Sequence, residues 1–94
     1  MNSTATEDLE IRRRRALYRA EHRGTKEMDL VLGPFAKARL DDMPEASLAL
    51  FEALLREPDP ELQDIFLGEG RPDGRFAELV GEIRSFHGLP VARQ

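Results

Sequence analysis

The chain has 94 residues, of which 34% are charged, 40% are hydrophobic and 6% are aromatic. This length supports a single domain, since domains typically hold roughly 100–150 residues, and the apolar fraction is sufficient for one modest core, which excludes a wholly disordered chain. The chain contains no cysteine, which excludes disulfides, thiolate nucleophiles and Cys-ligated metal centres.

The formal net charge is −4, and the charges are distributed unevenly. Residues 1–27 hold seven Lys or Arg and five acidic residues, whereas residues 28–94 hold seven and thirteen. Such an asymmetry bears on the choice of partners. The first residues lack the basic and apolar regions of a secretory signal, and no apolar run reaches the ~18 residues of a membrane span. We therefore expect a cytoplasmic protein.

Helical periodicity dominates the sequence, and the spacing of its apolar residues predicts five helices. The first runs from about residue 6 to residue 22, with Thr4 or Thr6 as its cap. Gly24 follows its last turn, where glycine can adopt the left-handed conformation that closes a helix. We therefore expect a tight corner at Gly24.

The second and third helices also have clear boundary signals. The second begins at Thr25, whose hydroxyl can cap it, and runs to about Leu40 with a kink at Gly33-Pro34. Pro44 is predicted as the first residue of the third helix, which Glu57-Pro58 ends.

The fourth helix is short and begins at Asp59-Pro60-Glu61, where Asp59 is predicted to be the cap. A loop over residues 68–74 separates it from the fifth helix, expected over about residues 75–87. The predicted fold is an all-α, compact five-helix bundle, with one domain over residues 1–94, ordered from about residue 6 to residue 88, and frayed termini. The apolar stripes of the five helices predict a core of Leu17, Met28, Val31, Leu32, Phe35, Leu48, Phe51, Leu54, Leu55, Leu62, Phe66, Phe76, Leu79, Val80 and Ile83.

Groups suited to catalysis are scarce. The histidines are His22 and His87, and no nucleophile, phosphate-loop or zinc-protease motif is present. Glu27 and Asp29 are two residues apart on a helix and point in different directions, so they do not form an acid/base pair. We therefore expect a protein that is not an enzyme.

The run Arg12-Arg13-Arg14-Arg15 is the most basic segment of the chain. Four successive residues spread around a helix, so the basic stripe consists of Arg12, Arg15, Arg19 and Arg23. Three interpretations stay open: a solvated helix face, a docking face for an acidic protein surface, and a nucleic-acid patch.

Residues 23–29 form the most informative segment. Arg23 precedes the start of the second helix, where free backbone amides favour anions, and Glu27 falls in its first turn. The residues alone permit a simple capped corner in which Arg23 and Glu27 pair with each other. They also permit a polar contact surface.

The ordered motifs around this segment resemble the SdhE family of succinate dehydrogenase flavinylation and assembly factors. The resemblance runs from about Leu17 to Ile83 and includes Arg-Gly-x-x-Glu-x-Asp at residues 23–29, followed by Leu-Val-Leu-Gly-Pro-Phe at residues 30–35. Further landmarks are Tyr18-Arg19, Leu-Phe-Glu-Ala-Leu-Leu at residues 50–55, Asp-Pro-Glu-Leu at residues 59–62 and Gly-Arg-Pro at residues 70–72.

The chain departs from the family at two positions. Many members carry Arg where this chain has His22, so one positive charge becomes dependent on pH. Many also carry Trp at the position of Ile65, which puts in doubt any contact made by that indole.

The resemblance implies binding to the flavoprotein subunit of succinate dehydrogenase or fumarate reductase and promotion of covalent FAD attachment to a histidine of that subunit. The flavoprotein subunit, called the client below, supplies the reacting groups. The assembly factor holds them in a reactive arrangement and does not itself bind a cofactor stably. The implied partner contacts are Arg23, Gly24 and Glu27, with Asp29 and Arg19 flanking them. We expect a monomer when the protein is free, without nucleic-acid or membrane partners. A regulatory module that binds nucleic acid or neutralises a toxin through the first helix is the alternative.

Overall fold

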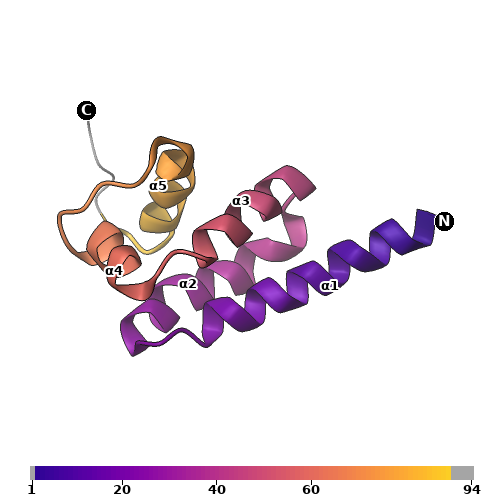
Figure 1. Ribbon diagram of the computed structural model, residues 1–94, viewed down its shortest axis with the longest axis horizontal. Coiled ribbons are helices and arrows are strands. Elements are labelled where there is room, and N and C mark those ends of the chain that lie inside the picture. Colours follow the sequence, from indigo (N-terminus) through magenta and orange to yellow (C-terminus); the bar gives the residue numbers. More distant parts are fainter. Residues whose placement is uncertain (1, 90–94) are drawn as a thin grey trace.

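The computed structural model describes residues 2–89, with side chains from residue 8 onward. Within this range the chain is entirely helical apart from turns and loops, which confirms the predicted all-α class (Figure 1). The elements in chain order are α1 (Asn2–Glu21), α2 (Lys26–Arg39), the 3-10 helix η1 (Leu40–Asp42), α3 (Glu45–Leu55), α4 (Asp59–Leu67), the 3-10 helix η2 (Gly74–Phe76) and α5 (Ala77–Phe86).

The helices form two groups that share α2. Helix α1 packs along α2 and also contacts α3, while α2 contacts α4 and α5 at the other end of the molecule (Figure 1). Short connections bring the α1–α2 corner and the α3–α4 turn to the same region. This arrangement positions the candidate site described below.

The core lies between these helices and contains every predicted core residue except Leu17, which is half-buried and packs against the core. Five further buried hydrophobic residues are absent from the predicted core: three alanines, and two residues in or directly after the 3-10 helix η1. Small side chains on α1 let its backbone approach α2 closely, which explains why alanines occupy part of this contact. The additional buried residues are Ala16, Ala20, Ala36, Leu40 and Met43.

Several predicted boundaries are wrong by a few residues. Helix α1 already begins at Asn2, so Thr4 and Thr6 lie inside it and do not cap it. Pro44 is the N-cap of α3 and not its first helical residue. The predicted fifth helix is divided into η2 and α5, because Phe76 closes a 3-10 turn before the α-helix starts. The predicted C-terminal fraying concerns residues 90–94, which lie outside the described residues.

Proline in the second helix does not end it. Helix α2 continues through Pro34, and the Thr25 hydroxyl caps its N-terminus as predicted, accepting a hydrogen bond from the Met28 N–H at 3.3 Å. Among residues 2–89 no helix is long and apolar enough to cross a membrane.

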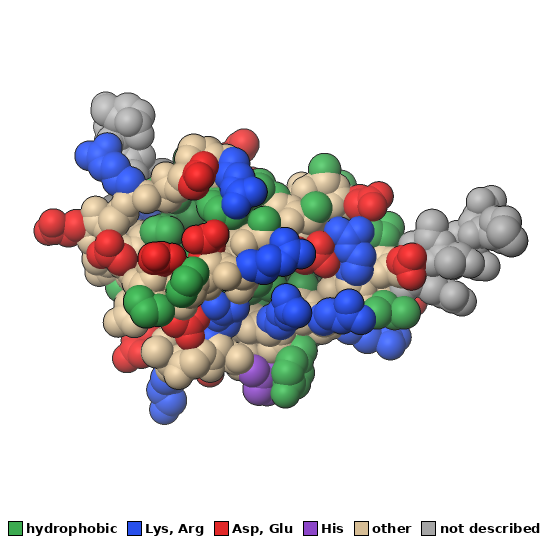
Figure 2. Space-filling view, viewed as in Figure 1, with side chains coloured by type: hydrophobic (Ala, Val, Ile, Leu, Met, Phe, Trp, Pro, Cys, Tyr) green, Lys and Arg blue, Asp and Glu red, His purple; other side chains and the backbone are tan. Residues whose placement is uncertain are grey.

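Charge is unevenly distributed over the face shown in Figure 2, where side chains of both signs occur on each half. Basic side chains gather along α1, and acidic side chains gather over α4 and α5. The asymmetry in the sequence is therefore also an asymmetry of the folded surface.

Candidate functional site: the α1–α2 corner

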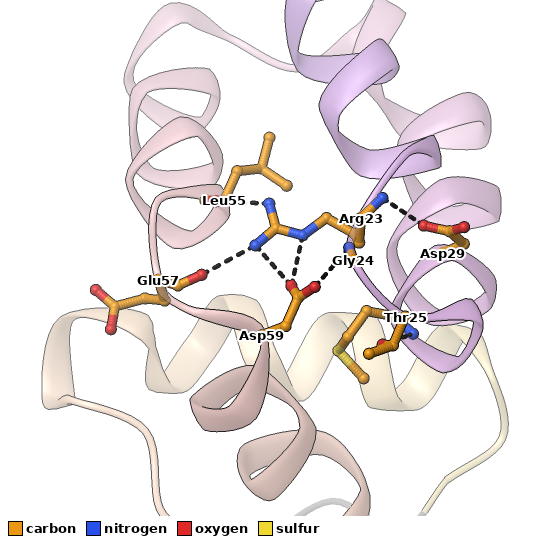
Figure 3. A network of polar contacts seen from close by, with 8 residues as sticks. Arg23, Gly24, Thr25, Asp29, Leu55, Glu57 and Asp59 are labelled. Carbon is orange, nitrogen blue, oxygen red and sulfur yellow. Dashed lines mark hydrogen bonds and ion pairs between the residues drawn. The ribbon is translucent and has the colours of Figure 1, made fainter.

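A network of polar contacts fixes the corner between α1 and α2 (Figure 3). The Arg23 backbone N–H donates to the Asp29 carboxylate, which ties the corner to the first turns of α2. Thr25 caps the same helix start. Contacts between residues close in the sequence thus already hold the corner on the α2 side.

The Arg23 side chain crosses from the corner to the turn between α3 and α4. Its Nη1 donates to the Leu55 carbonyl oxygen at 2.6 Å, and its Nη2 donates to the Glu57 carbonyl oxygen at 2.9 Å. Nε and Nη2 both lie 2.9 Å from Asp59 Oδ1. The side chains of Arg23 and Asp59 are only 12% and 16% exposed. A planar guanidinium can satisfy all these acceptors together, which an ammonium cannot do.

Asp59 has a different role from the predicted one. Pro58 occupies the N-cap position of α4, and Asp59 is the first residue of the helix, with no capping hydrogen bond from its side chain. Its Oδ1 faces Arg23 and its Oδ2 accepts from the Gly24 N–H at 2.6 Å. The carboxylate therefore joins α4 to the corner, which is why it turns away from its own helix.

Gly24 also has a different role from the predicted one, because its φ is not positive; among the described residues only Gly88 has a positive φ. The requirement for glycine is steric. A Cβ at this position would lie 2.7 Å from Asp59 Oδ2, which is closer than real Cβ contacts allow. The absent side chain thus lets the backbone N–H of Gly24 reach the carboxylate.

The predicted site residues fall into two groups. Arg23 and Asp29 are half-buried and hold the corner together, whereas Arg19, Gly24 and Glu27 are exposed. Arg23 pairs with Asp59 and not with Glu27, so the simple Arg–Glu corner is wrong. Glu27 stands on the first turn of α2, off the buried stripe of that helix.

An open groove of about 480 Å³ lies beside the corner. Three of its lining residues, Arg19, Arg23 and Gly24, belong to the predicted site. The other lining residues were not assigned to the site by the sequence analysis, and they are Tyr18, His22, Leu55, Arg56, Glu57, Pro58 and Asp59. The Asp-Pro-Glu signal at residues 59–61 marked Asp59 as a cap, and nothing local indicated that it pairs with a residue 36 positions earlier.

The basic stripe on α1 is partly neutralised. Arg12 forms ion pairs with Glu52 at 2.7 Å and Glu45 at 3.2 Å. The hydrogen bond from Arg12, aided by its charge, lowers the pKa of Glu52 and raises the pKa of Arg12 itself. Arg23 lies beyond the end of α1 and pairs with Asp59, so two of the four residues of the predicted stripe already have carboxylate partners. This weakens the nucleic-acid alternative, which needs several free cations in a row.

No group of His or acidic side chains suited to holding a metal ion occurs in the described part of the chain. The polar corner and the open groove beside it make up the candidate site. Such a surface can bind and position another macromolecule.

Comparisons with known proteins give the class. Residues 14–87 match the Sdh5 family, described as flavinator of succinate dehydrogenase. The chain is 43% identical over 67 residues to the FAD assembly factor SdhE of Acetobacter pasteurianus, covering 71% of this chain and 62% of that protein. It is 36% identical over 85 residues to the FAD assembly factor SdhE of Acinetobacter baylyi, covering 88% and 99%. It is 30% identical over 80 residues to the mitochondrial succinate dehydrogenase assembly factor 2 of Dictyostelium discoideum, covering 85% and 57%. No solved structure matches the chain.

These matches cover most of the chain and define a class of assembly factors. The chain spans less than two thirds of the Acetobacter and Dictyostelium relatives and nearly all of the Acinetobacter one. The protein belongs to the Sdh5/SdhE family of FAD assembly factors, which confirms the resemblance on which the sequence analysis relied.

Proposed function

We propose that this protein binds the flavoprotein subunit of succinate dehydrogenase, or of fumarate reductase, and promotes covalent attachment of FAD to a histidine of that subunit. The observation that supports the proposal is the corner itself: a half-buried ion pair between Arg23 and Asp59 holds the exposed Gly24 backbone, and Glu27 is exposed three residues further on, in the first turn of α2. The corner lies within residues 14–87, the part of the chain that matches the family described as flavinator of succinate dehydrogenase.

The chemistry belongs to the client in this proposal. When bound to the client, FAD would supply an electrophilic 8α-carbon, and a histidine of the client would supply the nucleophilic nitrogen. The assembly factor contributes by holding the client so that histidine and flavin meet in reactive geometry, which can account for a large part of a barrier. It needs no stably bound cofactor for this role.

The client contacts of the five predicted residues are part of this proposal, and the residues have two different roles in it. Arg19, Gly24 and Glu27 are exposed and can touch the client directly. Arg23 and Asp29 position these residues through the contacts described above, and direct client contacts by them stay a prediction. The monomeric state and the cytoplasmic location also stay predictions; the Dictyostelium relative is named as mitochondrial.

The test is flavinylation of the purified flavoprotein with FAD and the assembly factor, read as covalent flavin fluorescence on a denaturing gel. Glu27→Ala should lower the rate clearly while costing at most about 1 kcal/mol of unfolding free energy, because an exposed acid in a first helical turn contributes little to stability. Glu78→Ala is the matched control, since Glu78 is an exposed acid in the first turn of α5. Normal flavinylation with Glu27→Ala would refute the role of this residue, and no effect of the wild-type protein would refute the proposed function.

A further inference from the structure

The groove beside the corner has a positive rim, although the protein as a whole is acidic. It is bordered by the end of α1 and by the α3–α4 turn. Arg23 and Asp59 neutralise each other in its floor. Arg19 and Arg56 line it as exposed side chains from the two sides.

Two further carboxylates lie near this rim. The pKa of Glu52 is lowered by its hydrogen bond from Arg12, with which its carboxylate is already paired, and the charges of Arg56 and Arg15 contribute to the same effect. Glu57 lines the groove, but its carboxylate points away from the Arg23 network in Figure 3. Arg15 lies one turn before Arg19 on α1 and is also exposed, so it adds to the positive field. A groove with this charge favours an acidic partner, because complementary potentials raise the rate of encounter and fix the orientation.

An aromatic platform adjoins the same groove. The Tyr18 ring is stacked on the His22 ring, with centroids 4.0 Å apart and planes inclined by 21°. His22 Nδ1 lies 2.8 Å from the Tyr18 carbonyl oxygen, which holds the pair in place. Tyr18 is nevertheless 63% exposed, although tyrosine contributes a large apolar area when it is covered in an interface. The platform is thus preformed and uncovered.

We propose that this groove binds an acidic segment of the client, whose carboxylates meet Arg19 and Arg56 while an apolar side chain of the same segment covers Tyr18. The inference rests on the proposed function, because it names the part of the flavoprotein that is recognised. Two contributions to the affinity for the client are expected, one electrostatic and one apolar. The arginines supply a contribution that salt screens, and Tyr18 supplies one that salt leaves nearly unchanged.

The experiment measures the affinity for the purified flavoprotein by calorimetry at about 50 mM and about 500 mM NaCl, where the screening length falls from roughly 14 Å to roughly 4 Å. Arg19→Glu/Arg56→Glu should weaken binding at least about tenfold at low salt and by no more than about threefold at high salt. Tyr18→Ala should weaken binding by a similar factor, about fivefold, at both salt concentrations.

The matched control is Arg14→Glu/Lys37→Glu, which makes the same change in charge. Both residues are exposed and neither lines the groove; Arg14 lies about 140° around α1 from Arg19. The control should bind within about threefold of the wild type. Circular dichroism should show unchanged helical content in every variant.

The possible results distinguish a failure of the groove inference from a failure of the proposed function. If both double variants lose affinity equally, net charge and not the groove recognises the client, and the inference is wrong. Unchanged affinity of Arg19→Glu/Arg56→Glu overturns it as well. If the wild-type protein itself does not bind the flavoprotein at either salt concentration, the proposed function fails and the inference fails with it.

Discussion

The ion pair between Arg23 and Asp59 should contribute strongly to stability, although both residues lie near the surface. Removing one partner of a buried pair typically costs 3–5 kcal/mol, because the other charge remains without compensation. The small residual exposure of the two side chains, 12% and 16%, reduces this cost, so we expect Arg23→Ala to lower the free energy of unfolding by about 2–4 kcal/mol. The variant also leaves the Leu55 and Glu57 carbonyl groups without their donor.

The lysine variant tests geometry separately from charge. Arg23→Lys keeps the positive charge but cannot donate in a fixed planar fork to Asp59 and two carbonyl groups at once, so about 1–2 kcal/mol should be lost. Urea unfolding followed by circular dichroism at pH 7 measures both variants. Arg19→Ala is the control, since Arg19 is exposed and its substitution should change stability by less than about 0.5 kcal/mol.

A double-mutant cycle decides whether the pair acts as a unit. Arg23→Ala combined with Asp59→Ala should cost clearly less than the two single substitutions together, with a coupling of at least about 1 kcal/mol. Additive costs, or an Arg23→Ala variant as stable as Arg19→Ala, would refute the interpretation of Arg23 as the residue that holds the corner.

Three further predictions concern single contacts. Gly24→Ala should lower the free energy of unfolding by about 1–3 kcal/mol and weaken client binding, because its Cβ would displace the Asp59 carboxylate. Gly74→Ala is the control: its Cβ would meet nothing within 4 Å, so urea unfolding should show nearly unchanged stability. Equal losses of stability in the two variants would contradict the steric explanation. Phe51→Ala should cost about 3–5 kcal/mol, since its side chain is fully buried, and an unchanged thermal midpoint would show that this packing is wrong. The interaction with Arg12 that lowers the pKa of Glu52 stabilises the folded state at pH values above the ordinary pKa of a glutamate carboxyl group. This stabilisation is lost as the pH falls through the lowered pKa that Glu52 has in the folded state. Urea unfolding between about pH 6 and pH 3 should therefore show a steeper loss for the wild type than for Glu52→Gln, and parallel profiles would contradict this.

Local signals were sufficient to predict most of the fold. Apolar spacing on each helix identified the buried stripes, because a helix face is fixed by residues three and four apart. The Thr25 cap was predictable for the same reason, since its acceptor and donor are three residues apart. Leu40 and Met43 escaped prediction because they lie in and after a 3-10 turn, which has no long stripe.

The site could be predicted only in part. The motif at residues 23–29 located the corner, but the partner of Arg23 lies 36 residues away, and nothing local distinguishes an aspartate that caps its own helix from one that reaches another helix. The left-handed conformation that a glycine could adopt at Gly24 does not occur. The constraint on Gly24 comes from the Asp59 carboxylate and not from its own turn.

The bond between Gly24 and Asp59 has a consequence for the order of folding. The corner is encoded early in the chain, but the carboxylate that fixes it arrives 35 residues later, after α3 and the start of α4. Contacts between residues distant in sequence form only when the intervening chain has been ordered. A nascent or partly folded molecule can therefore hold the corner only through its local contacts, from the Arg23 N–H to Asp29 and at the Thr25 cap. The bond that links the corner to α4 is thus present only in a molecule folded as far as the start of α4.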